Sequence, residues 1–300
     1  MNQPSTSDRL GIWCALGAFT IWGLSPLYFR AVDSVPPAQV VAHRVIWSAA
    51  LLSLWLAWRA GWAPVRAALG RPRTLGLMGL TTVLITGNWL IYVWAVHAGR
   101  TIEASLGYFI NPLMNVLLGA LVLGERLRLP QWLAIALAAT GVALRVGALG
   151  QLPWIALLLA LTFATYGLLR KQASVDAVTG LYLETLIALP VAAAYLAWLA
   201  MSDSLSLGAG PGVTALLPLA GLITTVPLAL FATAARRLPL STVGLIQYLS
   251  PTLNFLVAVW VFGEPFDLAQ LAAFACIWAG LAVFSLDLLR ARPPAAPATP

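Results

Sequence analysis

His43, Arg44 and Glu184 are ionisable side chains within long apolar stretches of this chain, and Glu103 lies near the start of another such stretch. A charge at bilayer depth costs roughly 2.5–3.5 kcal/mol on insertion scales, so such residues are usually functional. We expect Arg44 either to snorkel or to pair with Glu184 as a lock or gate, whereas His43 or Glu184 could instead relay protons. Glu103 follows a helix start and suits the helix dipole there. Together the four are the predicted gating or coupling residues.

A second set combines aromatic rings with amides. Asn88 and Tyr92 are one turn apart, so they share a helix face with Trp89 beside them. Such a face suits an amphipathic organic molecule better than an inorganic ion. The alternative is helix packing together with interfacial aromatic belts. The predicted substrate contacts in both halves of the chain are Asn88, Trp89, Tyr92, Tyr108, Asn111, Asn115, Gln247, Tyr248 and Asn254.

Two prolines stand within apolar stretches, Pro112 and Pro251. A proline lacks the N–H that would bond the carbonyl four residues earlier, which here belongs to Tyr108 and Gln247 respectively. In lipid, a freed carbonyl must find protein or water. We therefore predict helix breaks at both prolines that face a central cavity and offer their carbonyls to substrate. The alternative is a plain kink satisfied by neighbouring Ser or Asn side chains.

Enzyme signatures are missing from the sequence. It holds no Gly-x-Ser-x-Gly and no Gly-x4-Gly-Lys-Ser/Thr loop, and its only lysine is Lys171. Cys14 and Cys276 are far apart within apolar stretches, which is typical of small buried hydrophobes. We expect no catalytic residue, no metal site and no cofactor.

Composition places these residues in a membrane. Of 300 residues 61% are hydrophobic and 9% charged, whereas a soluble chain carries roughly 25% charged residues. The net charge of +7 comes from arginines in short clusters between apolar stretches, a pattern of membrane topology rather than nucleic-acid binding. The polar N-terminus has no cleavage pattern, so the first span should anchor the chain.

Ten stretches have roughly the 20 apolar residues that a spanning helix needs. The fold class predicted is therefore all-α and polytopic. The stretches are 10–29, 37–58, 74–96, 102–123, 130–147, 152–169, 177–200, 212–234, 240–262 and 268–288.

The chain also contains an internal duplication. Tyr108-Phe109-Ile110-Asn111-Pro112 corresponds to Gln247-Tyr248-Leu249-Ser250-Pro251, and further identities follow at the same spacing. They are Pro112/Pro251, Asn115/Asn254, Gly124/Gly263, Glu125/Glu264, Gln131/Gln270 and Gly141/Gly280.

Each copy has five spans, so the second must enter the membrane from the opposite side. The arginines set the orientation with both termini cytoplasmic. The predicted organisation is a cytoplasmic tail (1–9), a first five-helix repeat (10–147), an inverted second repeat (148–290) and a disordered cytoplasmic tail (291–300). The cytoplasmic positive charges are Arg9, Arg59, Arg66, Arg71, Arg73, Arg126, Arg128, Arg170, Lys171, Arg236, Arg237, Arg290 and Arg292, against Arg30, Arg100 and Arg145 outside.

Ten spans, the duplication and a Gly-Glu pair that ends a span in each half resemble the drug/metabolite transporter superfamily, in its EamA-like branch. The strings His43–Ser48 and Glu103–Pro112 are more specific to one group within that branch, and Gly124-Glu125-Arg126 is typical of the superfamily. The resemblance implies two EamA-type repeats around a central cavity in an inner-membrane permease that exports small organic molecules.

The function predicted is a permease that moves small amphipathic metabolites or drugs, as an exporter, by alternating access between inverted repeats. Its expected partners are the bilayer and a small organic substrate, with proton or ion coupling open and no nucleic acid. Two alternatives stay open: a lipid or lipid-carrier flippase, and a membrane scaffold that transports nothing.

Overall fold

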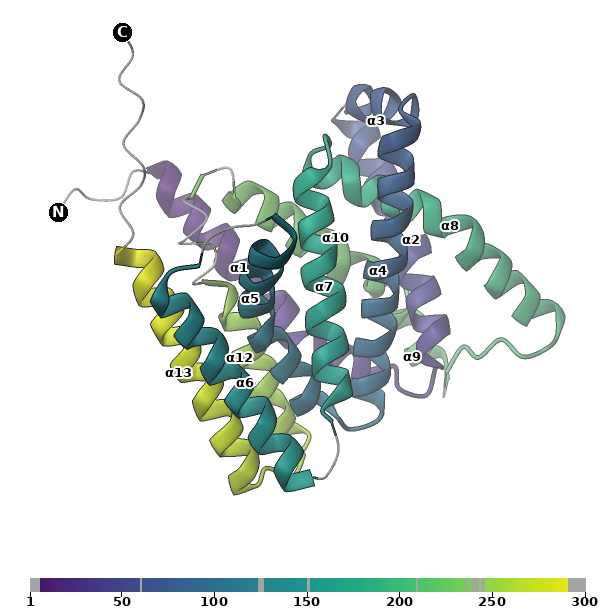
Figure 1. Cartoon of the computed structure of the whole chain (residues 1–300). Helices are drawn as coiled ribbons and strands as arrows, with labels where there is room; N and C mark the ends of the chain where they lie inside the picture. The colour runs from purple at the N-terminus through teal and green to yellow at the C-terminus, as the bar shows by residue number, and fades with distance from the viewer. Residues whose placement is uncertain are drawn as a thin grey trace, which may run out of the picture.

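The computed structural model describes residues 6–59, 61–123, 127–149, 152–208, 210–235, 237–238, 243 and 246–290. Within them all regular structure is helical, and the helices form one bundle (Figure 1). The Gly124-Glu125-Arg126 string, residues 1–5 of the predicted N-terminal tail and the 291–300 tail lie outside the described residues.

The helices follow the predicted apolar stretches. In the first half they are α1 (Thr6–Ala31), α2 (Pro37–Trp58), α3 (Trp62–Leu69), α4 (Pro72–His97), α5 (Thr101–Leu123) and α6 (Leu129–Leu149). In the second half they are α7 (Trp154–Gln172), α8 (Ala177–Met201), α9 (Pro211–Leu216), α10 (Leu219–Ala235), α12 (Leu249–Leu256), the π-helical turn η1 (Val257–Val261) and α13 (Leu268–Arg290).

Among the described residues, seven helices are long and apolar enough to cross a membrane, and three shorter apolar helices accompany them. The prediction of an all-helical, multi-pass membrane protein is confirmed. Some details differ from the sequence prediction. The loop expected at 59–73 holds the short helix α3, and the eighth stretch is divided between α9 and α10 by a turn at Leu217 and Pro218.

The helix break predicted at Pro112 is not found, whereas the second half has an interruption just before Pro251. Helix α5 continues through Pro112 to Leu123, because the helix geometry survives the loss of one amide donor. In the second half the helix is interrupted at Tyr248, and Pro251 lies in the first turn of α12, where a proline is well tolerated. The interruption lies in the turn before Pro251, where the missing N–H of the proline leaves the Gln247 carbonyl without its helical partner.

The two halves of the chain are interleaved. Helix α1 packs on α10 and α12 of the second half, and α7 packs on α4 and α5 of the first. In the same way α2 meets α10 and α8 meets α4, while α6 and α13 lie side by side (Figure 1). By their order in each half, the helices that correspond to α1, α2, α4 and α5 are α7, α8, α10 and α12. If each helix is exchanged for its counterpart, the contacts of α1 and α2 with the second half become the contacts of α7 and α8 with the first.

We call the end of the bundle where α1 and α4 end and α5 begins the distal end, and the end where α4 and α8 begin the proximal end. Arg44 lies in the distal part of α2, and Glu184 lies in the proximal part of α8. The two embedded charges are thus held at opposite depths of the bundle.

Candidate functional site

A polar cluster lies between α4, α5 and α7, centred on Asn88. The Nδ2 of Asn88 donates to the carbonyl oxygen of Leu159 at 3.0 Å and to Oγ1 of Thr162 at 2.9 Å. The hydroxyl of Tyr108 donates to Oδ1 of Asn88 at 3.2 Å. Asn88 is fully buried, so these bonds satisfy an amide that would otherwise be costly at this depth. One side chain thereby joins the two halves of the chain.

Aromatic rings extend this cluster towards α1. The rings of Tyr92 and Tyr108 are 5.5 Å apart between centroids, and those of Tyr92 and Phe29 are 5.7 Å apart. The hydroxyl of Tyr92 shares a hydrogen bond of 3.3 Å with Oγ of Ser25 and lies near Asn254 of α12. The predicted residues Asn88, Tyr92 and Tyr108 therefore meet in one place.

Arg44 completes the cluster from α2. Its Nε donates to Oγ1 of Thr224 on α10 at 2.7 Å, and its guanidinium carbon lies 4.1 Å from the ring centroid of Trp89. The Phe29 ring lies 5.9 Å away. The predicted pair between Arg44 and Glu184 is wrong, because α2 turns Arg44 towards Trp89 and α10 instead.

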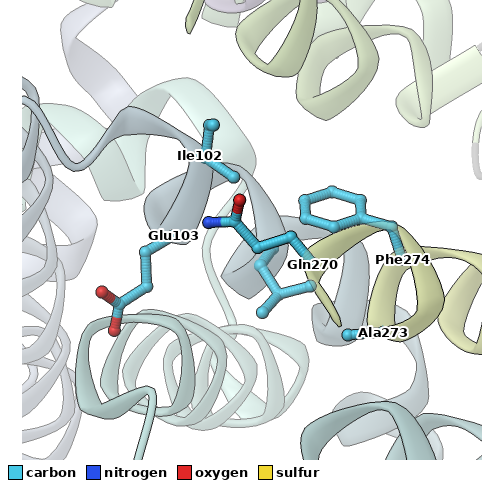
Figure 2. Close-up of a pocket in the computed structure, with 6 residues that line it drawn as sticks. Ile102, Glu103, Gln270, Ala273 and Phe274 are labelled. Atoms are coloured by element: carbon cyan, nitrogen blue, oxygen red, sulfur yellow. The ribbon is translucent and has the colours of Figure 1, made fainter. Parts of the chain in front are cut away.

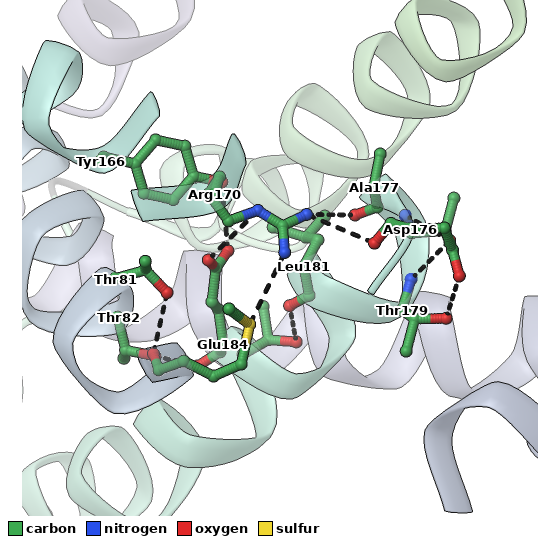
Figure 3. A network of polar contacts seen from close by, with 12 residues as sticks. Thr81, Thr82, Tyr166, Arg170, Asp176, Ala177, Thr179, Leu181 and Glu184 are labelled. Atoms are coloured by element: carbon green, nitrogen blue, oxygen red, sulfur yellow. Dashed lines mark hydrogen bonds and ion pairs between the residues drawn. The ribbon is translucent and has the colours of Figure 1, made fainter. Parts of the chain in front are cut away.

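Glu184 has a different cationic partner, shown in Figure 3. Its Oε1 lies 3.7 Å from Nε of Arg170, and Oε2 accepts from the hydroxyl of Tyr166 at 3.3 Å. The backbone carbonyl of Glu184 also accepts from Oγ1 of Thr82 on α4 at 3.4 Å. This network ties α7 and α8 to α4 in the proximal part of the bundle.

Arg170 also secures the start of α8. Its Nη2 donates to the carbonyl oxygens of Asp176 and Ala177, each at 3.3 Å. The Asp176 carboxylate caps α8 by accepting from the amides of Val178 and Thr179 at 3.0 Å. Burial raises the pKa of Asp176, but the bonds from the Thr179 hydroxyl and these amides outweigh it, so the net pKa lies below the ordinary value.

Two carboxylates hold helix starts at the distal end. The buried Glu264 accepts from the amides of Thr101 and Ile102 at 2.7 and 2.8 Å, so it caps α5. Glu103 pairs with Arg100 and accepts from the amide of Ile155 at the start of α7 at 3.1 Å. Glu103 therefore lies in the first turn of α5, where it was predicted to favour the helix dipole, and it also holds the start of the neighbouring helix α7.

A small pocket adjoins Glu103 between α5 and α13, where Gln270 reaches towards α5 (Figure 2). It lies at the distal end, away from Asn88. Its lining residues are Ile102, Glu103, Leu106, Gln270, Ala273 and Phe274.

The other predicted residues fall into three groups. Asn111 and Asn254 are buried, and their Oδ1 atoms have no hydrogen-bond partner among the described residues. The Nε2 of His43 has none there either. Asn115 is exposed on α5. Gln247 and Tyr248 are half-buried just before α12, and Tyr248 packs against a separate apolar cluster around Phe109.

Sequence reasoning missed the hydroxyl partners of the cluster, Ser25, Thr162 and Thr224, and the cap made by Glu264. Serine and threonine are common within membrane helices, so their types carry little signal. Glu264 could have been found, because it belongs to a duplicated Gly-Glu pair.

Comparison with known proteins decides the family. The family model described as the EamA-like transporter family matches residues 9–147 and 153–286. The chain belongs to the EamA-like transporter family. It is therefore a membrane transporter and not an enzyme. Within the part of the chain that the structure describes, no group of His, Cys, Asp and Glu side chains could hold a metal ion.

Two relatives of this EamA-like chain support the family assignment. It is 47% identical over 292 residues to an uncharacterized transporter of Vibrio cholerae, covering 97% of each chain. It is 46% identical over 288 residues to the protein RarD of Salmonella typhimurium, covering 96% of this chain and 98% of the relative. The group indicated by the His43–Ser48 and Glu103–Pro112 strings, RarD, is thus confirmed.

A solved structure supports the fold of this EamA-like chain. This structure, described as "Crystal structure of protein", superposes on the present chain with a TM-score of 0.62. The alignment covers 94% of this chain and 99% of the other at 21% identity, so the likeness concerns the fold alone.

Proposed function

We propose that this protein is an inner-membrane permease, with both termini cytoplasmic, that exports small amphipathic organic molecules by alternating access between two inverted five-helix repeats. The observation that carries the proposal is the cluster of Asn88, Tyr92 and Tyr108 with Arg44 and Trp89. One amide, aromatic faces and one cation converge there from α2, α4 and α5 of the first half, and Leu159, Thr162 and Thr224 of the second half hydrogen-bond to them.

The exchange pattern of helix contacts supports the alternating mechanism. Helix α1 contacts α10 and α12 in the same way as its counterpart α7 contacts α4 and α5. Each half can therefore take the conformation of the other, which gives the protein two pseudo-equivalent arrangements. Inverted repeats use such a pair of arrangements to open one site to either side in turn. The boundaries 10–147 and 148–290 are the ones we propose for the repeats.

Unsatisfied groups support a pathway through the α5–α12 contact. Ser105 of α5 donates to the carbonyl oxygen of Pro251 at 2.8 Å, so the two helices touch there. The buried Oδ1 atoms of Asn111 and Asn254 have no partner among the described residues. A buried acceptor without a partner costs about 1–3 kcal/mol of stability. The protein gains from keeping such an acceptor if a substrate or water molecule hydrogen-bonds to it during transport.

The test is flux in proteoliposomes of purified protein with a panel of small aromatic and aliphatic metabolites. We expect at least one panel member to cross the membrane of the proteoliposomes faster than it crosses the membrane of empty liposomes. The Asn88→Leu variant should lower this flux. Absence of any flux would contradict the permease and favour a scaffold. Movement of a labelled lipid without metabolite flux would favour a flippase. Reporter fusions in the 59–73 and 203–210 loops test the orientation, with the first expected inside and the second outside.

A further inference from the structure

Arg44 is a buried cation whose hydrogen-bonding capacity is largely unused. Its side chain is 7% exposed. A guanidinium carries five N–H donors, yet among the described residues its one hydrogen bond runs from Nε to Thr224 at 2.7 Å. The Trp89 ring at 4.1 Å stabilises the charge through its face, but a ring face cannot accept the remaining donors as a carboxylate does.

No described carboxylate neutralises Arg44. The carboxylates that do have partners are engaged elsewhere in the bundle. They are Glu184 with Arg170, Glu103 with Arg100, Asp33 with Arg30, Asp287 with Arg128, Glu264 with the start of α5, Asp176 with the start of α8 and Asp267 with the start of α13. A buried cation without a counter-ion is costly, and retaining one is reasonable where an anion arrives from outside the protein.

The surroundings of Arg44 indicate what kind of anion fits. Tyr28, Tyr92 and Tyr108 lie close enough to interact electrostatically with the guanidinium, and Trp89 covers one of its faces. The tyrosine hydroxyls already have partners, so these residues offer chiefly the apolar area of their rings. A compact inorganic ion would leave that apolar area unused, whereas a planar carboxylate on an apolar or aromatic body would use both.

We propose that Arg44 is the anion-recognition residue of this transporter and that its substrates carry a carboxylate attached to an apolar or aromatic body. The carboxylate accepts from the free guanidinium nitrogens, and the body lies against Trp89, Tyr92 and Tyr108. This inference rests on the proposed function, since it gives the transport site its substrate class.

Matched ligand pairs test the inference on the wild-type protein without any mutation. Three pairs differ only in charge: benzoate and benzamide, 3-phenylpropionate and 3-phenylpropionamide, and indole-3-acetate and indole-3-acetamide. Affinity is measured on the purified full chain by ligand-dependent thermal stabilisation. We expect the acid to bind about tenfold or more tightly than its amide in at least one pair, as one charge-assisted bond allows. Equal affinity within all three pairs would overturn the proposal.

Substitutions at Arg44 then assign the preference to this residue. Arg44→Gln is expected to bind acid and amide equally, and Arg44→Lys to keep a weakened preference because an ammonium lacks the planar fork. Arg30→Gln, a change at an exposed arginine, is the matched control and should keep the full preference. A preference that persists in Arg44→Gln would overturn the assignment. If that variant does not fold, an undiminished preference in Arg44→Lys would overturn it instead.

Flux measurements separate this proposal from the proposed function. If acids and amides both cross the membrane at equal rates, the permease stands and the anion-recognition role of Arg44 fails. If acids bind through Arg44 but nothing crosses, the binding role stands and the permease fails.

Discussion

Gly141 of α6 lies directly against the backbone of α13: a Cβ at this glycine would come within 2.7 Å of the carbonyl oxygen of Ala273. Gly280 of α13 mirrors it, since a Cβ there would come within 2.8 Å of the carbonyl oxygen of Ala134 on α6. In the duplicated sequence Gly141 corresponds to Gly280 and Ala134 to Ala273. The contact is therefore reciprocal, and α6 and α13 run antiparallel along it.

Gly141→Ala should destabilise the protein, because the obstructing atom is backbone and cannot rotate away. Overpacking of this kind typically costs about 1–3 kcal/mol. The measurement is the melting temperature of the purified protein in detergent. Gly147→Ala is the matched control on the same helix: nothing lies within 4 Å of a Cβ there, so its melting temperature should hold or rise. Equal melting temperatures for the two variants would contradict the close contact.

Arg170 and Glu184 should behave as one energetic unit. Removing one partner of a buried pair costs about 3–5 kcal/mol, because the other charge is left uncompensated. We therefore expect Arg170→Met and Glu184→Gln each to lower stability, and the double variant to lose less than the two losses combined. The measurement is a double-mutant cycle of denaturation free energies.

The control for this cycle pairs Arg44→Gln with Glu184→Gln. The structure holds these two side chains in different networks, so their effects should add. Strong coupling between Arg44 and Glu184, with none between Arg170 and Glu184, would show that the assignment of partners is wrong.

Loss of the Glu264 cap should loosen the start of α5. Glu264→Ala removes both acceptors from the amides of Thr101 and Ile102, at a cost of about 1–3 kcal/mol for buried donors left unpaired. Glu264→Gln keeps one acceptor and should cost less. Amide hydrogen exchange at residues 101–102 is the measurement: it should rise most in the alanine variant. Unchanged exchange there in Glu264→Ala would contradict the cap.

Asn111→Leu should separate folding from transport. The Oδ1 of Asn111 has no partner among the described residues, so replacing the amide with a similar apolar volume should change stability by less than about 1 kcal/mol. We expect flux in proteoliposomes to be abolished all the same. Thr140→Val on the exposed side of α6 is the control and should leave both unchanged. Normal flux in Asn111→Leu would remove this residue from the pathway.

The sequence by itself determined the all-helical membrane fold, the family and the candidate residues of the central cluster. Apolar stretches, their lengths and a repeated run of Pro, Asn, Gly and Glu are local properties that can be read along the chain. Polar residues such as Asn88, Tyr92 and Arg44 stand out because their cost in lipid makes them rare.

Only the tertiary structure decided which of these residues meet. Arg44 points to Trp89 and Thr224, and Glu184 pairs with Arg170, because the rotation of each helix about its axis sets which side chains face each other. The uninterrupted course of α5 through Pro112 and the cap that Glu264 places on α5 likewise became visible only in the structure. The hydrophobicity of each residue can be read from the sequence and shows which segments lie in the membrane. Which side chains contact each other depends on distances between helices that are far apart in the sequence, and these distances are known only from the structure.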